Sequence, residues 1–408
     1  MLTVEEARAL VLARFQPLEA EEAPLTEALG RVLAEDALAR EASPPFANSA
    51  MDGYALRSAD TRQASTRAPV RLRLVGEVPA GSVYPGVVQT GEAVRILTGA
   101  PLPDGADAAL QQELTEVDNG WVTIAQPVAP DTNVRHAGED ARPGMLLARA
   151  GADLGPAEIA LLASLGVSPV RVTRRPRVAI LATGDELAPI GQPLKPGQIH
   201  ESNTPYLIAA VTRAGGAPTA LGIAPDRAEA LREKLAQARQ GFDLVITSGG
   251  VSVGDYDLVK QMLSEQGSME FWRVRMRPGK PLAFGALGET PLLGLPGNPA
   301  SAAVTFELFG RPAIRRMLGA AQVERPLIEV ILEDGEQRRS DRRHFVRVRL
   351  ASRGGRLVAR PTGEQESHLI SSLQGATALL IVPEGEGVIR AGDTAQALLL
   401  NDAMPWAE

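Results

Sequence analysis

The chain of 408 residues contains no cysteine, and this absence excludes disulfide bonds, thiolate metal ligands and thiol catalysis. Histidine is scarce as well. The four histidines, His136, His200, His344 and His368, are scattered without the spacing of a metal site, so we expect each in a loop or at the surface. No apolar run approaches the ~20 residues that span a bilayer, and the first residues lack the basic and apolar regions of a signal peptide. We therefore expect a cytoplasmic protein.

The chain also lacks an excess of basic over acidic residues. The formal net charge of −7 provides no general attraction to nucleic acid or to an anionic membrane, so any anion site must be a local basic cluster. The composition, with 44% hydrophobic and 22% charged residues, is ordinary for a globular protein. The length exceeds what one core usually serves, which predicts roughly two to four domains.

The first part of the chain alternates between helical and strand signals. Residues 1 to about 40 predict helices, with a capping box at residues 3–6. Short alternating strands between residues 69 and 134, separated by Gly, Pro and Asp, predict a small β module. A helix is predicted again at residues 155–165, with Pro156 in its first turn. If this helix packs with the first ones, the first domain is discontinuous and the β module is inserted into it.

The second part alternates strands with helices. Strands are predicted at residues 178–182, 219–223, 244–247, 271–276 and 292–295, and helices at 204–214, 227–239, 256–265 and 300–317. Such alternation predicts a three-layer α/β domain with a mainly parallel sheet, in which ligands bind at the carboxyl ends of the strands. Further short strands after residue 325 predict a compact β-barrel of about five or six strands.

The complete pattern predicts a multidomain protein of the α/β plus β class. Residues 1–44 and 141–173 are expected to form a discontinuous N-terminal domain of helices and linkers, and residues 45–140 an inserted β-rich domain. Residues 174–322 are expected to form the α/β domain and residues 323–408 the C-terminal β-barrel.

The Gly-rich loop at residues 248–257, Ser-Gly-Gly-Val-Ser-Val-Gly-Asp-Tyr-Asp, is the most informative segment of the chain. It follows a predicted strand and precedes a predicted helix. Gly249 and Gly250 let backbone N–H groups approach an anion, and the helix adds the positive end of its dipole. Asp255 and Asp257 oppose an anion unless a cation such as Mg²⁺ lies between carboxylate and phosphate. The loop therefore predicts a site for a phosphorylated ligand and a metal; the alternative is a turn whose aspartates only cap the helix.

Several loops after predicted strands carry reactive groups: residues 183–186, 225–226, 248–257 and 296–301. All four are expected at the same edge of the sheet, and such convergence is harder to explain by chance than any one loop. Their carboxylates would repel one another unless cations intervene: Asp185, Glu186, Asp226, Asp255 and Asp257. A Mg²⁺ ion held by Asp226 and Asp257 would relieve this repulsion and draw a pyrophosphate or adenylate oxygen into the site.

One segment of this acidic protein concentrates basic residues. Arg273, Arg275 and Arg277 alternate, so we expect them to share one face of a strand, which is typical of a solvated charged surface. The turn Arg277-Pro-Gly-Lys280 differs, because it presents two cations together on a fixed loop. That arrangement suits a tetrahedral oxyanion.

Two segments of the N-terminal half have the composition of functional loops. Residues 48–55, Asn-Ser-Ala-Met-Asp-Gly-Tyr-Ala, are predicted to be neither regular strand nor helix, and they surround Asp52 with small residues, as in a loop against a ligand or another subunit. Residues 95–107 are similar, and residues 138–140 add another carboxylate. Each segment alone is equally well explained as a turn.

Together these motifs resemble the molybdopterin molybdenumtransferase family, that is MoeA and the gephyrin E domain. The matching segments follow the family's order through almost the whole chain: residues 48–55, 98–100, 138–140, 183–186, 248–254, 278–281 and 295–299. The resemblance implies an enzyme that takes adenylylated molybdopterin and molybdate and releases molybdenum cofactor and AMP in a Mg²⁺-dependent step. It also implies an elongated homodimer, with the active site between the α/β domain of one subunit and the Asp52 loop of the other, and the adenylyltransferase that supplies the substrate as a partner.

Carried over by position, the resemblance assigns three groups of site residues. The acidic catalytic positions are Asp52, Asp140, Glu186, Asp226 and Asp257, of which Asp226 and Asp257 are the expected Mg²⁺ ligands. The substrate-binding positions are Thr98, Ser248, Gly249, Gly250, Ser252, Gly254, Asp255, Pro296, Asn298 and Pro299. The molybdate-binding positions are Arg277, Lys280, Ser301, Arg347 and Ser367.

Two positions depart from the family's pattern. Arg277 stands where Lys is usual, and His200-Glu-Ser-Asn203 stands where Tyr-Asp-Ser-Asn is commoner. Arginine keeps the cation but adds a planar fork, so we expect oxyanion binding with an altered geometry. Two alternatives are the related single-domain adenylyltransferase, which does not need the additional regions, and a non-catalytic dimeric scaffold, which the retained carboxylates and cations argue against.

Overall fold

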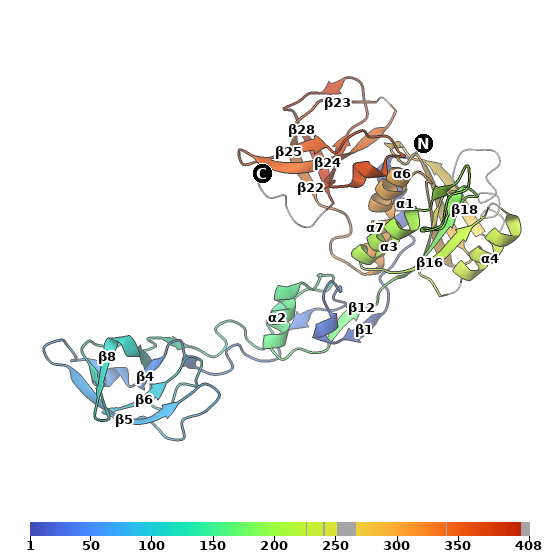
Figure 1. The fold of residues 1–408 in the computed structure, drawn as a ribbon. Coiled ribbons are helices and arrows are strands. Elements are labelled where there is room, and N and C mark those ends of the chain that lie inside the picture. Colours follow the sequence, from blue (N-terminus) through green and yellow to red (C-terminus); the bar gives the residue numbers. More distant parts are fainter. Residues whose placement is uncertain (226, 240, 251–266, 340, 401–408) are drawn as a thin grey trace.

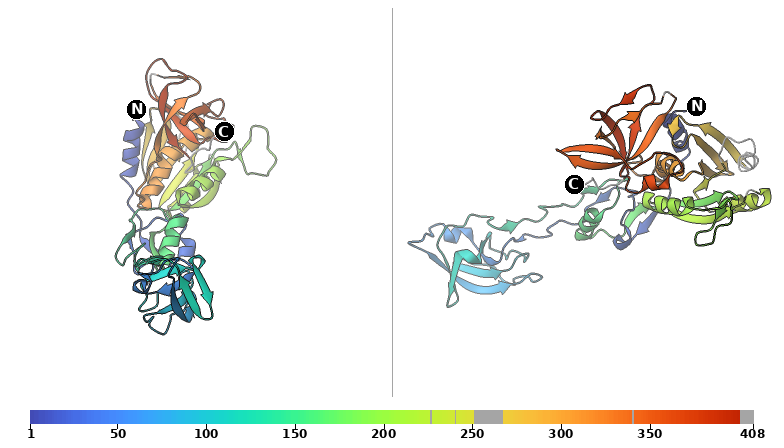
Figure 2. Two further views of the ribbon diagram at one scale, coloured as in Figure 1. Left: turned by 90° about the vertical axis from the view of Figure 1, so that its left-hand side faces the viewer. Right: turned by 45° about the horizontal axis from the view of Figure 1, so that its top comes forward.

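The computed structural model describes residues 1–225, 227–239, 241–250, 267–339 and 341–400. Figure 1 shows an elongated molecule: a small β domain lies at one end, a narrow middle region follows, and an α/β domain and a β-barrel lie together at the other end. The views in Figure 2 agree with this arrangement. None of the helices within the described ranges is long and apolar enough to cross a membrane.

The α/β domain is built on a six-stranded sheet, and the predicted mainly parallel order is confirmed. The parallel strands, in spatial order, are β16 (Ala217–Ala224), β13 (Arg177–Thr183), β17 (Leu244–Ser248) and β21 (Thr290–Leu295). Two antiparallel strands, β20 (Pro281–Leu287) and β18 (Gly267–Arg273), complete the sheet. A short parallel pair, β14 (Leu187–Ala188) and β15 (Ile199–His200), follows β13.

Helices cover both faces of this sheet, which explains the continuous apolar runs of its central strands. The described helices are α3 (Asn203–Ala214), α4 (Ala228–Ala238), α6 (Pro299–Thr305) and α7 (Arg311–Met317). Ile180 of β13 packs in one core with α3, α6 and α7, whereas the next residue, Leu181, packs in a second core with α4. The helix predicted at 300–317 is present, with a π-helical turn at Phe306–Gly310. The helix predicted at 256–265 lies outside the described residues.

Helix α1 (Val4–Leu12) begins at the predicted capping box, where the Glu6 N–H donates to Thr3 Oγ1 at 3.0 Å and the Thr3 N–H donates to Glu6 Oε2 at 2.7 Å. Its buried residues Val4 and Val11 belong to the core of the α/β domain. We therefore propose that the discontinuous domain begins after α1, and not at residue 1.

The prediction of helices up to about residue 40 is wrong beyond α1. Residues 13–40 contain β1 (Ala20–Ala23), a 3₁₀ turn (Leu25–Glu27) and β2 (Ala37–Leu38). Strand β1 pairs with β12 (Val170–Thr173), and β2 pairs with β11 (Leu146–Ala148). Pro17 and Pro24 interrupt any long helix, and the apolar residues face helix α2 (Pro156–Ser164) in a separate small core.

The inserted domain is a six-stranded β structure. Its strands in spatial order are β7 (Ala108–Gln111), β4 (Gly53–Leu56), β6 (Glu92–Ile96), β5 (Val70–Val78), β9 (Trp121–Ile124) and β8 (Thr115–Asp118). The prediction that residues 48–55 form no regular strand is wrong for Gly53, Tyr54 and Ala55, which lie in β4 between β6 and β7. Strand β3 (Asn48–Ser49) pairs with β10 (Val134–Arg135), so only residues 50–52 form the loop.

The C-terminal strands close into a five-stranded barrel, as predicted. In order around the barrel they are β24 (Arg343–Arg353), β25 (Arg356–Pro361), β22 (Leu327–Leu332), β28 (Thr394–Leu399) and β26 (Ala378–Val382), which pairs again with β24. A hairpin of β23 (Glu336–Gln337) and β27 (Val388–Ile389) lies beside it. A short strand of the α/β domain, β19 (Met276–Arg277), pairs in parallel with the start of β24.

This pairing corrects the prediction for the basic segment. Strand β18 ends at Arg273, and β19 is a separate strand that pairs with the barrel, so Arg273, Arg275 and Arg277 do not share one strand face. The alternation of arginines is a local pattern and predicts one continuous strand. The strand ends at Arg273 because the next residues pair with β24 of the barrel instead. The Arg277 backbone pairs with His344.

A charge network holds the linker after β12 against the α/β domain. Arg174 donates from Nη1 and Nη2 to the Asp243 carboxylate at 2.7 and 2.9 Å, and the Arg177 N–H donates to the same carboxylate at 2.7 Å. Burial alone would raise the pKa of Asp243, but these hydrogen bonds outweigh it and hold the pKa below its ordinary value.

We expect Asp243→Asn to lower the stability of the α/β domain by about 2 kcal/mol at neutral pH, the typical contribution of hydrogen bonds to a charged group. Because the folded-state pKa of Asp243 is depressed, this stabilisation is present above the unfolded-state pKa and is lost as the pH falls through the folded value. Urea unfolding of both proteins at pH 7 and at pH 3 measures the difference. The difference in unfolding free energy between wild type and Asp243→Asn should be smaller at pH 3 than at pH 7. The control is Asp118→Asn at an exposed position, which should be as stable as the wild type at both pH values.

Candidate functional site

Four neighbouring parallel strands bring their following loops to one edge of the sheet. Strands β16, β13, β17 and β21 end at Ala224, Thr183, Ser248 and Leu295, and they are adjacent in that order. The predicted convergence is therefore confirmed for the loop residues that the structure describes: 183–186, 225, 248–250 and 296–301. Five predicted site residues lie outside the described residues: Asp226, Ser252, Gly254, Asp255 and Asp257.

The start of the Gly-rich loop requires glycine. Gly249 has φ 92°, and a Cβ built on it would lie 2.7 Å from the Thr183 carbonyl oxygen. Its N–H donates to the Leu295 carbonyl at 3.1 Å, so the backbone is held between two strand ends. Gly250 also has a positive φ, 68°. The sequence therefore uses glycine here because the chain turns sharply in a space that has no room for a side chain.

Asn203, the first residue of α3, joins two of the loops, a role that the sequence analysis missed. Its Nδ2 donates to Ser248 Oγ and to the Gly297 carbonyl, both at 2.7 Å. Glu201 is buried, and its Oε1 accepts from the N–H groups of Asn203 and Thr204 at 2.8 and 2.9 Å. The N-terminus of α3 is therefore neutralised by the chain's own carboxylate. The only signal in the sequence was the departure at residues 200–203 from the family's pattern.

The loop after β21 meets the barrel. Asn298 precedes α6, and its Nδ2 donates to Ser367 Oγ at 2.9 Å, while the Ala300 N–H donates to the Ser367 carbonyl at 3.1 Å. Pro299 begins α6, and Ser301 in its first turn is buried. The structure thus brings Ser367, predicted to bind molybdate, into contact with Asn298, predicted to bind the pterin substrate.

Two other predicted residues at this edge lie close by. Pro296 is buried directly after β21. Glu186 is exposed, and its carboxylate lies so close to Gly184 that a Cβ there would collide with it. The Glu186 carbonyl accepts from the Ile199 N–H at 2.8 Å, which holds the loop against β15.

A buried basic cluster lies at the boundary between the α/β domain and the barrel. Arg347 of β24 is fully buried, and its Nε donates to Ser372 Oγ at 3.0 Å and its Nη2 to the Glu366 carbonyl at 3.2 Å. Arg277 of β19 donates from Nη2 to Glu366 Oε1 at 2.8 Å. Both guanidinium groups therefore contact the same residue. Among the described residues, Arg347 Nη1 is buried without a hydrogen-bond partner.

Burial and the nearby charge of Arg277 lower the pKa of Arg347 to about 10. Burial, together with Arg277, Arg347 and Arg339, lowers the pKa of His344 to about 3, so its imidazole is neutral at ordinary pH. His344 is only 6% exposed, which corrects the expectation that every histidine lies in a loop or at the surface, because β24 carries it inward beside β19. The other three histidines are exposed.

The cluster contains further polar atoms that the described chain leaves unsatisfied. His344 Nε2 is buried without a partner, and so is Thr305 Oγ1, which lies against Gly279 in the turn between Arg277 and Lys280. Buried polar groups are normally hydrogen-bonded, and unpaired ones indicate a ligand or water. Positive charge combined with unused polar atoms fits an oxyanion.

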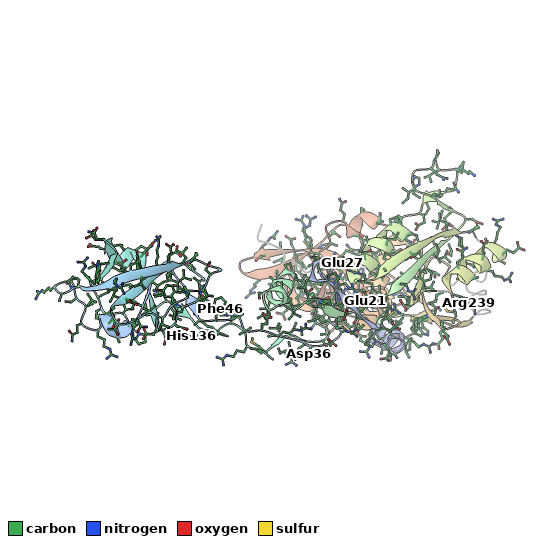
Figure 3. All side chains as sticks on the ribbon, turned by 90° about the horizontal axis from the view of Figure 1, so that it is seen from below. Glu21, Glu27, Asp36, Phe46, His136 and Arg239 are labelled. Carbon is green, nitrogen blue, oxygen red and sulfur yellow. The ribbon has the colours of Figure 1, made fainter. Side chains whose placement is uncertain are left out.

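The predicted residues of the N-terminal half lie elsewhere. The Asp52 carboxylate accepts from the backbone N–H and the Oγ1 of Thr98, both at 2.7 Å, and these two hydrogen bonds lower its pKa. Asp140 is exposed, and its N–H donates to the Ser43 carbonyl at 2.9 Å. Figure 3 labels His136 at the inner end of the inserted domain and Arg239 at the opposite end of the molecule. Within one chain, Asp52 and Asp140 are therefore not brought to the sheet edge.

Comparisons with known proteins cover nearly the whole chain. Three family descriptions match in order: "MoeA N-terminal region (domain I and II)" over residues 2–166, "Probable molybdopterin binding domain" over 179–316 and "MoeA C-terminal region (domain IV)" over 329–400. Molybdopterin molybdenumtransferase of Haemophilus influenzae is 36% identical over 401 residues, which cover 97% of each chain. The protein of that name from Bacillus subtilis is 35% identical, with 100% of this chain and 96% of the other covered.

A solved structure shows the same architecture. The molybdopterin biosynthesis MoeA protein of Pyrococcus horikoshii OT3 matches with a TM-score of 0.83 at 32% identity, covering 98% of this chain and 100% of that one. Fold and matches together define a multidomain transferase with a molybdopterin-binding α/β domain. The chain belongs to the MoeA family, the molybdopterin molybdenumtransferases, and this places it in molybdenum cofactor biosynthesis. The resemblance seen in the sequence is confirmed, and the single-domain adenylyltransferase is not favoured.

We expect Gly249→Ala to lower the melting temperature, because an alanine at this φ is strained and its methyl group meets the Thr183 carbonyl. Such strain costs about 1–3 kcal/mol. The matched control is Gly297→Ala in the neighbouring loop, where a Cβ would meet only the Gly249 Cα at 3.7 Å, an ordinary contact. Scanning fluorimetry compares the three proteins. Equal melting temperatures of Gly249→Ala and wild type would contradict the packing described for this loop.

Proposed function

We propose that the protein inserts molybdenum from molybdate into adenylylated molybdopterin and releases molybdenum cofactor and AMP. The observation that carries this proposal is the buried basic cluster around Arg347 and Arg277, which has unpartnered polar atoms and lies beside the strand-end loops. A phosphorylated pterin and a tetrahedral dianion would then bind next to each other. The names of the relatives support the same reaction class.

The strand-end loops are proposed to hold the phosphorylated part of the substrate. Gly249 and Gly250 present backbone rather than side chain at the edge of the sheet, and Asn203 fixes their position relative to Gly297. Thr98, carried by the inserted domain, fixes the orientation of the Asp52 carboxylate by two hydrogen bonds. Catalysis then rests on positioning and charge neutralisation, and no side-chain nucleophile is required.

Asp226 and Asp257 are proposed to hold a Mg²⁺ ion. Both residues lie outside the part of the chain that the structure describes. Within the described part, no group of three His, Asp or Glu residues could hold a metal. The chemistry of the donors fits the ion, because one or two carboxylates completed by phosphate and water oxygens are its usual environment in proteins. The exposed carboxylates of Asp185 and Glu186 at the same edge make a cation there favourable. When bound, Mg²⁺ would neutralise charge on the phosphoryl group.

Molybdate is proposed to bind where the turn of residues 277–280 meets the barrel. Arg277 and Arg347 supply positive charge from β19 and β24, and Lys280 closes the turn. Ser301 and Ser367 add hydroxyl groups from α6 and from the barrel loop that contacts it. The burial of Arg347 strengthens its interaction with an anion, because little water competes for the guanidinium.

Removing either cation of the turn, Arg277 or Lys280, should raise the molybdate requirement. We expect Arg277→Ala and Lys280→Ala each to increase the half-saturating molybdate concentration about ten- to a hundredfold, since a charge-assisted hydrogen bond contributes about 1.5–3 kcal/mol. Arg277→Lys should change it little, because the cation remains. Arg273→Ala, an exposed arginine at the end of β18, is the control. Molybdate titrations of AMP release decide the matter: an unchanged half-saturation in both alanine variants would place the oxyanion elsewhere.

We further propose that the active enzyme is a homodimer. Asp52 and Asp140 lie on the inserted domain, which is separated from the α/β domain of its own chain by the middle region (Figure 1). A second subunit is the simplest way to bring these carboxylates to the sheet edge. Each active site would then take the α/β domain from one subunit and the Asp52 loop from its partner.

Mixing two variants tests this arrangement, at a molybdate concentration far below the half-saturation expected of Lys280→Ala, where each variant alone is nearly inactive. Asp52→Ala and Lys280→Ala damage different halves of the site, so a mixed dimer contains one site without either substitution. Random exchange of equal amounts should restore about one quarter of wild-type activity. The control mixture, Asp52→Ala with Asp140→Ala, should restore none, because both residues come from the same half. Failure of the first mixture to regain activity, once subunit exchange is verified by light scattering of size-tagged chains, would contradict a shared site.

A further inference from the structure

We propose that Glu366 is a built-in counter-ion of the oxyanion site, which an entering oxyanion must displace from Arg277. Glu366 then sets the oxyanion concentration at which the site fills. The inference deepens the proposed function and rests on it. It assigns a role to a residue of the barrel loop that lies next to the predicted molybdate-binding residue Ser367.

Within the described part of the chain, Glu366 connects the guanidinium groups of Arg277 and Arg347. Its Oε1 lies 2.8 Å from Arg277 Nη2, and its carbonyl oxygen accepts from Arg347 Nη2 at 3.2 Å. A carboxylate and a tetrahedral oxyanion both present negatively charged oxygens to an arginine in the same way. The carboxylate of Glu366 therefore occupies the position on Arg277 that an oxygen of the bound oxyanion would take.

The two partners of this ion pair differ in their freedom to move. The Glu366 side chain is 57% exposed, whereas that of Arg277 is 22% exposed and Arg347 is fully buried. The carboxylate lies on the solvent side and can rotate into water without unpacking a core, but the arginines remain in place. Ion pairs with such exposure contribute modestly, so displacement is feasible for a strongly bound anion.

The backbone that carries Glu366 is held at the next residue. Ser367 accepts from Asn298 Nδ2 through its Oγ and from the Ala300 N–H through its carbonyl. The loop is therefore anchored to α6, and the carboxylate is free to leave Arg277 by side-chain rotation alone. The oxyanion site can fill without movement of the barrel loop.

The other charges around the cluster do not replace Glu366 in this role. Asp341 and Glu336 lie near enough to act on Lys280 and Arg277, respectively, but among the described residues the carboxylate that is hydrogen-bonded to Arg277 is that of Glu366. His344 is buried and unpartnered at Nε2, and as a neutral group it brings no charge to the cluster. With the carboxylate displaced, Arg277 and Arg347 face the anion together.

Direct binding of molybdate to the full-length protein tests the inference without turnover. Isothermal titration calorimetry of wild type and Glu366→Gln should show a dissociation constant about three- to tenfold lower in the variant, because the amide no longer competes for Arg277 with a negative charge. The matched control is Glu364→Gln, an exposed glutamate two residues away, which should bind molybdate like the wild type. Glu366→Asp keeps the charge but shortens the side chain, so we expect an intermediate constant.

The outcomes separate this inference from the proposed function. Tighter binding in Glu366→Gln, with Glu364→Gln unchanged, supports the counter-ion. Equal or weaker binding in Glu366→Gln, with a wild type that does bind molybdate, overturns it and leaves the proposed function standing. Equal tightening in both glutamine variants also overturns it, since a general loss of negative charge would then be the cause. If none of the proteins binds molybdate, the oxyanion site itself is misplaced and both proposals fall.

Discussion

The short parallel ladder between β19 and β24 is the interaction on which the candidate site depends. Met276 pairs with Arg343 and Arg277 with His344, and this ladder attaches the barrel to the α/β domain at the edge where the parallel strands end. The turn up to Lys280 is closed within the α/β domain, where the Val274 N–H donates to the Lys280 carbonyl at 2.8 Å, and the ladder adds the barrel to it. With it, two domains supply one site, and Arg277 is placed where Glu366 and Arg347 of the barrel surround it.

Burial determines both the affinity of this site for an anion and the electrostatic cost of its unpaired cations. A fully buried guanidinium such as that of Arg347 is costly unless it is hydrogen-bonded, and Ser372 and the Glu366 carbonyl satisfy only part of it. The remaining donor is available to a ligand. Neighbouring His344 stays neutral, which limits the repulsion among the cations. Binding of an oxyanion would therefore relieve an electrostatic cost that the folded chain already carries.

The elongated shape divides the proposed catalytic residues between two places. The inserted domain orients Asp52 by two hydrogen bonds from Thr98, although this domain and the described part of the α/β domain lie at opposite ends of the molecule (Figure 1). Such pre-orientation at an exposed position has a clear use if another subunit provides the remainder of the site. The β module has its own small cores, so it can present this loop as a rigid unit.

Local patterns in the sequence were enough to predict the α/β sheet, the closed barrel and the strand-end loops around Gly249, because periodicity and glycine placement act over a few residues. They failed for residues 13–40, where pairing with distant strands replaces the expected helices. The tertiary structure alone decided three features: the burial of His344, the hydrogen bonds by which Asn203 joins two loops, and the contact of Arg277 with Glu366. The last two partners are 89 positions apart, and no local pattern records which distant segments a strand will meet when it folds.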